Sequence, residues 1–143
     1  MITLITMDRF QEFLLSICKS DTSSDPDRWT PENFLWGHSA VVSLMAQDVF
    51  GGELVMIPLK GTEFAALCFH YWNELSDTWQ ADFTRDQFQG RFPRDVSSMR
   101  CNREGLLRSQ FTPTFYGTLV IDDTAKRYEL LRGRLADELR SES

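Results

Sequence analysis

The sequence predicts an α+β fold in one domain of 143 residues. Helical and strand-like hydrophobic patterns follow one another in the order α-α-β-β-β-α, which is typical of helices packed on an antiparallel sheet. The length fits a single domain over residues 1–143, and no internal repeat is visible. Hydrophobic residues at 42% and charged residues at 25% match an ordinary globular protein and argue against extensive disorder.

Two helices are predicted in the first third of the chain. An apolar stripe at helical spacing marks the first one: Phe10, Phe13, Leu14 and Ile17. We expect Asp8 to cap this helix, with Gln11 as its capping-box partner. The second helix is expected from Ser39 to Phe50, because Gly51-Gly52 follows it as a helix stop.

Strand patterns occupy the middle of the chain. They cover residues 53–57, 64–75 and 79–83, and a short turn at 76–78 joins the last two into an antiparallel hairpin. Residues 89–110 show no clear period and are expected to be irregular. A final helix is predicted over residues 123–139 from an apolar stripe of one tyrosine and three leucines.

Composition excludes several classes of function. The net charge of -6 disfavours nucleic-acid binding, which needs a positive field. No stretch approaches the ~20 apolar residues of a membrane span, and the first residues lack the basic region of a signal peptide. Cys18, Cys68 and Cys101 are too few and too scattered for a disulfide framework, so we expect a cytoplasmic protein. No metal-binding motif is present, and no cofactor is expected.

A histidine and an aspartate are expected to meet on the predicted hairpin. Side chains alternate across a strand, so His70 and Trp72 share one face together with Cys68. If Leu75 pairs with Trp79, Trp72 lies opposite Asp82, which places Asp82 one diagonal step from His70. A register change of one residue would send Asp82 to the other face. A carboxylate in this place would fix the tautomer of the imidazole.

Ser39 is the candidate nucleophile for such a pair. It lies at the start of the second helix, where free backbone N–H groups can stabilise a developing anion. Serine is also a preferred N-cap residue, so a purely structural role is the more common explanation. Cys68 is a second nucleophile candidate, although a cysteine in a strand is usually a packing residue.

Arginines gather after the hairpin. Residues 85–108 hold six arginines against three acidic residues in an otherwise acidic chain. Surface ion pairs explain such a segment in most proteins. The alternative is a positive lip, with Arg100 and Arg103, that binds an anionic substrate such as a carboxylate or a carrier-bound acyl group.

Several sequence blocks resemble the YunG-like family of small bacterial proteins. They are the blocks at residues 29–33 (WTPEN), 36–41 (WGHSAV), 47–54 (QDVFGGEL), 70–73 (HYWN), 82–88 (DFTRDQF) and 127–131 (RYELL). The resemblance implies a reduced papain-like or transglutaminase-like fold. It also implies a nucleophile, a histidine and an aspartate at Ser39, His70 and Asp82.

The sequence departs from the usual family pattern Trp-Gly-Gln-Cys-Ala at two places. His38 stands for the glutamine and Ser39 for the cysteine. A serine cannot be ionised as a cysteine can, so it must pass its proton to a base during attack. Three interpretations follow: a natural serine enzyme, a pseudoenzyme that binds without turnover, or a deliberate replacement of the cysteine. The paired change disfavours the last one and makes His38 a second candidate base or oxyanion donor.

The sequence therefore favours an acyl-transfer or hydrolytic enzyme acting on an amide, ester or thioester. Ser39 would attack, His70 would act as base and Asp82 would orient it, with Trp36, Tyr71 and Trp72 lining the cleft. The expected partner is a small-molecule or carrier-bound acyl substrate. A degenerate binding module and a plain interaction protein are the alternatives. The sequence leaves the oligomeric state open.

Overall fold

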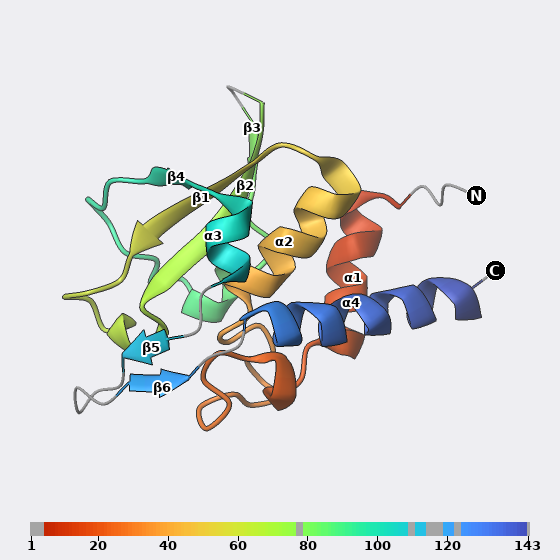
Figure 1. Ribbon diagram of the computed structural model, residues 1–143, viewed down its shortest axis with the longest axis horizontal. Helices are drawn as coiled ribbons and strands as arrows, with labels where there is room; N and C mark the ends of the chain where they lie inside the picture. The colour runs from red at the N-terminus through yellow and green to blue at the C-terminus, as the bar shows by residue number, and fades with distance from the viewer. Residues whose placement is uncertain (1–4, 77–78, 109–110, 114–118, 122–123, 143) are drawn as a thin grey trace.

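The first helix, α1 (Met7–Ile17), forms where the apolar stripe predicts it. Its four predicted stripe residues are all buried in the core. The N-cap is Thr6, whose hydroxyl accepts from the amide of Arg9, so the expected cap at Asp8 is wrong. Asp8 lies within the first turn, where its charge suits the positive end of the helix dipole. The computed structural model describes residues 5–76, 79–108, 111–113, 119–121 and 124–142 (Figure 1).

The second helix, α2 (Ser39–Phe50), has the predicted bounds. Its first two turns are buried on nearly every side, which fits a helix enclosed between the sheet and other helices. Gly51 ends it with a φ of 76°, a conformation that glycine adopts without a steric penalty. The N-cap is His38, so Ser39 is the first residue of the helix rather than its cap.

Four antiparallel strands form the main sheet in the order β3-β2-β1-β4. Their bounds are β1 (Glu53–Pro58), β2 (Phe69–Ser76), β3 (Trp79–Ala81) and β4 (Met99–Cys101). Strand β1 lies in the centre and pairs with both β2 and β4. The hairpin of β2 and β3 is present as predicted, with a register shift between Glu74 and Ser76.

The predicted strand over residues 64–75 begins later than expected. Residues Ala65–Leu67 form the one-turn 3₁₀ helix η2, and Cys68 follows it with a φ of 67°. Strand β2 starts at Phe69, so Cys68 is not a strand residue on the face of His70. Its backbone in the left-handed region breaks the alternation that the sequence pattern suggested.

The segment expected to be irregular holds short elements. These are β4 and helix α3 (Arg103–Leu107). Beyond residue 110, the short strands β5 (Phe111–Pro113) and β6 (Leu119–Ile121), which no sequence pattern predicted, pair with each other. The 3₁₀ helices η1 (Ser20–Thr22) and η3 (Arg85–Phe88) are also short. Elements of three to five residues leave no hydrophobic period in a sequence, which explains why pattern analysis missed them.

Helices lie on one side of the sheet (Figure 1). Helix α4 (Thr124–Ser141), predicted over nearly the same residues, packs with α1 and α2 around the larger core. A second cluster lies among Val55, Ile57 and Trp72 of the sheet, together with Phe64 and Phe88. The molecule is thus a small single α+β domain with an apolar cluster on each face of the sheet.

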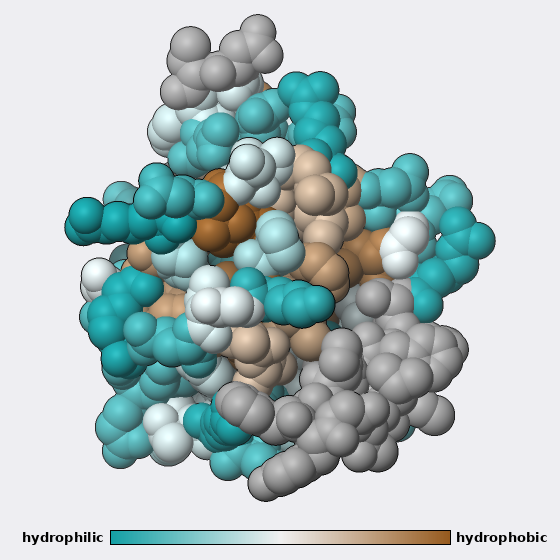
Figure 2. Space-filling view, turned by 90° about the vertical axis from the view of Figure 1, so that its left-hand side faces the viewer, coloured by the Kyte–Doolittle hydropathy of each residue, from teal (hydrophilic) through white to brown (hydrophobic). Residues whose placement is uncertain are grey.

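One side of the molecule carries exposed apolar surface. Figure 2 shows brown and tan residues gathered in the middle of this side, framed by hydrophilic residues. Phe69 and Met99 are large hydrophobic residues of the sheet that remain exposed. No helix among the described residues is long and apolar enough to cross a membrane.

Candidate functional site

The predicted contact between His70 and Asp82 is present. Asn73 pairs with Ala81 and Glu74 with Gln80, which is the register that the sequence analysis expected for this part of the hairpin. Asp82 follows β3 directly, and its Oδ2 lies 2.7 Å from Nε2 of His70. The turn closes through Ser76 and Trp79 instead of Leu75 and Trp79, and the resulting bulge leaves the face of Asp82 unchanged.

Asp82 is held as a charged group from three directions. His70 and the Nε of Arg85 both lie 2.7 Å from its Oδ2, and the amide of Thr84 donates to its Oδ1 at 3.3 Å. Burial alone would raise the pKa of Asp82, but its hydrogen bonds and charge contacts with His70 and Arg85 outweigh burial and lower this pKa. The carboxylate therefore accepts from the imidazole and fixes its tautomer, with the proton on Nε2.

The His70 ring is enclosed by aromatic side chains. Trp72 stacks beside it at 5.7 Å between ring centroids, while Phe88 and Phe92 meet it edge-on at 4.7 and 5.5 Å. Only 1% of His70 is exposed. Its Nδ1 is buried and has no hydrogen-bond partner among the described residues. With the proton on Nε2, this atom holds a lone pair that nothing in the described chain uses.

Ser39 lies at a helix N-terminus with its hydroxyl uncommitted. It is buried, and its side chain makes no hydrogen bond within the described part of the chain. The side chain of His38 makes no capping bond either, so the first N–H groups of α2 are not capped by a side chain. The turn before Ser39 needs Gly37, where a Cβ would come within 2.2 Å of Ser23 Oγ.

His38 is committed elsewhere, which removes it as a base or oxyanion donor for Ser39. Its Nε2 lies 2.7 Å from the hydroxyl of Thr22, and its Nδ1 lies 3.0 Å from the carbonyl of Trp36. The ring is fully buried, and this burial lowers the pKa of His38 to about 4. A neutral imidazole with both nitrogen atoms bonded ties the loop around η1 to the start of α2.

Comparison with known protein families adds to this geometry. The family model described as YunG protein matches residues 6–140. The chain belongs to the YunG family. The searches of curated proteins and of solved structures return no match.

Gln87 joins the two parts of the candidate site, and no sequence pattern indicated a role for it. It is buried on η3, where its Oε1 accepts from the amide of Gly37 at 3.1 Å and its Nε2 donates to the carbonyl of Thr84 at 3.1 Å. One side chain thus connects the turn before Ser39 with the turn after Asp82. The only signal in the sequence was its place in the block at 82–88 that resembles the family.

One of the three aromatic residues expected to line a cleft, Trp72, contacts the histidine. Trp72 stacks on His70 and donates from Nε1 to Gln80. Trp36 is a half-buried neighbour of the cluster that contains Trp72, and its Nε1 donates to Asp25. Tyr71 points to the opposite face of the sheet, where it packs against the larger core, so it is not part of the surroundings of His70.

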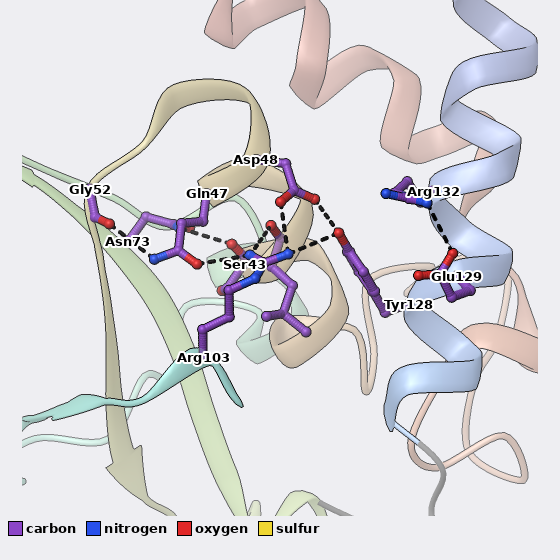
Figure 3. Close-up of polar contacts among 10 residues, drawn as sticks. Ser43, Gln47, Asp48, Gly52, Asn73, Arg103, Tyr128, Glu129 and Arg132 are labelled. Atoms are coloured by element: carbon purple, nitrogen blue, oxygen red, sulfur yellow. Dashed lines mark hydrogen bonds and ion pairs between the residues drawn. The ribbon is translucent and has the colours of Figure 1, made fainter. Parts of the chain in front are cut away.

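Arg103, expected in a substrate-binding lip, makes its hydrogen bonds within the fold. It reaches between α2 and α4 and donates to the carbonyl of Leu44 and to the side chains of Gln47, Asp48 and Tyr128 (Figure 3). Burial and the hydrogen bond to Asp48 raise the pKa of Tyr128. Arg103 thus connects α3 with α2 and α4. Arg100 lies apart from it and forms an exposed pair with Glu74 at 2.7 Å.

The described cysteines and acidic residues form no metal-binding cluster. No disulfide joins the three cysteines; Cys18 is a core residue, and burial raises its pKa strongly. Burial also raises the pKa of Cys101. Within the described ranges, no group of three or more His, Cys, Asp or Glu residues is placed to hold a metal ion.

Proposed function

We propose that this protein is a hydrolase or acyltransferase that acts on an amide, ester or thioester through Ser39, His70 and Asp82. The observation that carries the proposal is the state of His70. Its Nε2 contacts a carboxylate while its buried Nδ1 is unpartnered among the described residues. A structural histidine in a core normally has both nitrogen atoms satisfied, so the unused lone pair supports a chemical role.

The position of Ser39 supports its assignment as nucleophile. Gly37 is bonded to Gln87, and the next residue, Phe88, packs edge-on against the His70 ring. The start of α2 and the histidine are therefore connected through one turn of η3. Strand β3 ends at Ala81, so β1 is the only described strand that pairs with β2 at His70. The reaction that we propose requires the Ser39 hydroxyl to come within hydrogen-bond reach of Nδ1 when substrate binds.

The roles of the three residues follow from their chemistry. Nδ1 of His70 takes the proton of Ser39 as Oγ forms a bond to the carbonyl carbon, and Asp82 stabilises the imidazolium. The uncapped N–H groups of α2 stabilise the oxyanion. The leaving group then takes the proton from His70 and departs. Water or another acceptor releases the acyl group from Ser39 by the same steps in reverse.

The papain-like or transglutaminase-like relation is part of this proposal. A nucleophile at a helix N-terminus, a histidine on a strand and an aspartate after the next strand follow one another in the chain as Ser39, His70 and Asp82. The family resemblance implies the same order with a cysteine as nucleophile. The hydroxyl of serine needs direct proton transfer to His70, whereas a thiol there would ionise in advance.

A binding module is the second candidate. It is favoured by the burial of His70 and by the absence of a hydrogen bond between Ser39 and His70 in the described structure. In that case the same site would hold a small molecule or a carrier-bound acyl group without forming a covalent bond. The two candidates differ in whether Ser39 becomes acylated.

Intact-mass spectrometry after mixing with activated acyl esters and thioesters tests the proposal. We expect an acyl adduct on the wild type that is absent in Ser39→Ala and reduced about 10²–10⁴-fold in rate in His70→Ala. Ser43→Ala is a matched control, because Ser43 is a buried serine one turn further along α2. An adduct only in Ser39→Cys would show an intact scaffold without natural covalent chemistry and would favour the binding module.

A further inference from the structure

The three aromatic residues around His70 differ in how firmly the fold holds them. Trp72 belongs to β2, and Phe88 belongs to η3 and is fully buried. Phe92 lies in a stretch with no helix or strand, between η3 and β4, and is half-buried. Phe92 is therefore the member of this group that can leave with the least disturbance of regular structure.

The Phe92 ring fills a specific place. Its edge contacts are with His70 and with Phe88, at 5.5 and 5.1 Å between centroids. The guanidinium carbon of Arg85 lies over its face at 3.4 Å from the centroid. A positive charge over a ring face and edge-on aromatic neighbours are the contacts that recognise a flat aromatic group.

Arg85 connects this place with the proposed reaction centre. Its Nε lies 2.7 Å from the same oxygen of Asp82 that contacts His70, so Arg85 and His70 share one oxygen atom as their partner. The guanidinium is thus fixed by Asp82 at one edge while its face covers Phe92. A group that replaced Phe92 would meet the same charge and the same aromatic neighbours beside the His70 ring.

We propose that Phe92 is a movable plug in an aromatic binding slot, and that the acyl group of the substrate carries a flat aromatic ring that displaces Phe92. This inference rests on the proposed function, which requires a substrate to reach His70. It names the class of substrate as aromatic acyl compounds. The slot consists of His70, Trp72, Arg85 and Phe88, with Phe92 as its occupant in the unbound protein.

The first test measures access to His70 without any need for catalysis. Diethyl pyrocarbonate modifies unprotonated imidazole nitrogen atoms, and peptide mass spectrometry reports each histidine separately. We expect His70 to be modified about tenfold faster or more in Phe92→Ala than in the wild type. His38 is the internal control, because it is equally buried but has both nitrogen atoms bonded and lies outside the slot.

Phe69→Ala is the matched control variant, since Phe69 is an exposed phenylalanine next to His70 in the chain. It should leave the modification of His70 within about twofold of the wild type. The proposal is overturned if His70 is no more reactive in Phe92→Ala than in the wild type. It is also overturned if His38 becomes reactive in parallel, because Phe92 then supports the whole domain and is not a movable plug.

The second test measures the chemistry of the slot. In Phe92→Ala, benzamide at about 10 mM should restore much of the protection of His70, whereas acetamide at the same concentration should not. Equal protection by both amides, or by neither, contradicts an aromatic slot. These results do not depend on acylation of Ser39. If the slot binds benzamide and Ser39 never becomes acylated, the proposed function fails while the slot remains as a binding site.

Discussion

The two histidines of this chain are equally buried and differ in what their nitrogen atoms do. His38 bonds to the hydroxyl of Thr22 and to the carbonyl of Trp36, so its ring is fully satisfied. His70 contacts Asp82 through Nε2 and leaves Nδ1 without a partner in the described chain. A satisfied buried imidazole stabilises the fold, whereas a buried nitrogen atom without a hydrogen-bond partner costs stability. The comparison supports the proposed chemical role of His70 and a structural role of His38.

Charge distinguishes the two regions as well. Burial lowers the pKa of His38 to about 4, so its neutral form belongs to the folded state. The hydrogen bonds and charge contacts of Asp82 with His70 and Arg85 outweigh its burial and lower its pKa. The region of His38 thus avoids charge, and the region of His70 keeps a carboxylate ready to stabilise an imidazolium.

Replacing each histidine in turn should give the largest difference between the two regions. His70→Ala should slow acylation of Ser39 by about 10²–10⁴-fold, because it removes the base. His38→Gln should change the same rate by less than about tenfold. Time-resolved intact-mass spectrometry measures both rates. Equal losses in the two variants would contradict separate roles for the histidines.

The pH dependence of stability sharpens the comparison. An unfolded histidine titrates near pH 6.5, and His38 in the fold titrates near 4, so the unfolded state binds protons more readily between these values. Stability is complete above about pH 6.5 and should fall by roughly 2–3 kcal/mol between pH 7 and pH 4.5. Urea denaturation at the two pH values measures the loss.

The control for this prediction is His38→Gln, whose stability should be nearly constant over the same window. Asp82 acts in a different window, because a lowered carboxyl pKa gives stability that is lost only as pH falls below the ordinary value of about 4. A wild type that keeps its full stability at pH 4.5 would contradict the assignment of His38 as a buried neutral group.

Gln87 tests whether the two regions are coupled. Gln87→Leu removes the acceptor of the buried Gly37 amide and leaves that amide unpaired, whereas the carbonyl of Thr84 keeps its bond from the backbone amide of residue 87. We expect a loss of about 2 kcal/mol in unfolding free energy and about a tenfold slower acylation of Ser39. Gln11→Leu is the control, since Gln11 makes a single hydrogen bond to Phe83 from α1 and should affect stability only. An unchanged acylation rate in Gln87→Leu would show that the two regions are not coupled.

Local patterns predicted a large part of this site. The bounds of α2 follow from its composition and from Gly51. The hairpin has the expected register at Asn73 and Ala81, although its turn is shorter than expected and a bulge compensates for the difference. This register places Asp82 on the face of His70 without any long-range information. The prediction succeeds because both residues belong to one hairpin, whose geometry is set by neighbours in the chain.

The rest depends on contacts between distant segments. The partners of His38 are set by the loop at η1, sixteen residues earlier, and those of Gln87 by the turn fifty residues earlier. Neither sequence distance carries a periodic signal. The expected cap at Ser39 failed for a related reason, because the cap is one residue earlier and makes no side-chain bond. Buried polar networks join segments that are distant in the chain, so local sequence patterns do not predict them.

Two arginines give the smallest effects and a final distinction between structure and binding. Arg103→Ala removes four hydrogen bonds that join α3 to α2 and α4, and it should cost about 1–2 kcal/mol in unfolding free energy. Arg100→Ala removes an exposed pair with Glu74 and should cost less than about 0.5 kcal/mol. Neither change should alter the rate of Ser39 acylation by an anionic ester, measured at low and high salt. A salt-dependent loss in the double variant would restore the positive lip that the sequence suggested, because only a charge that meets the substrate is screened in this way.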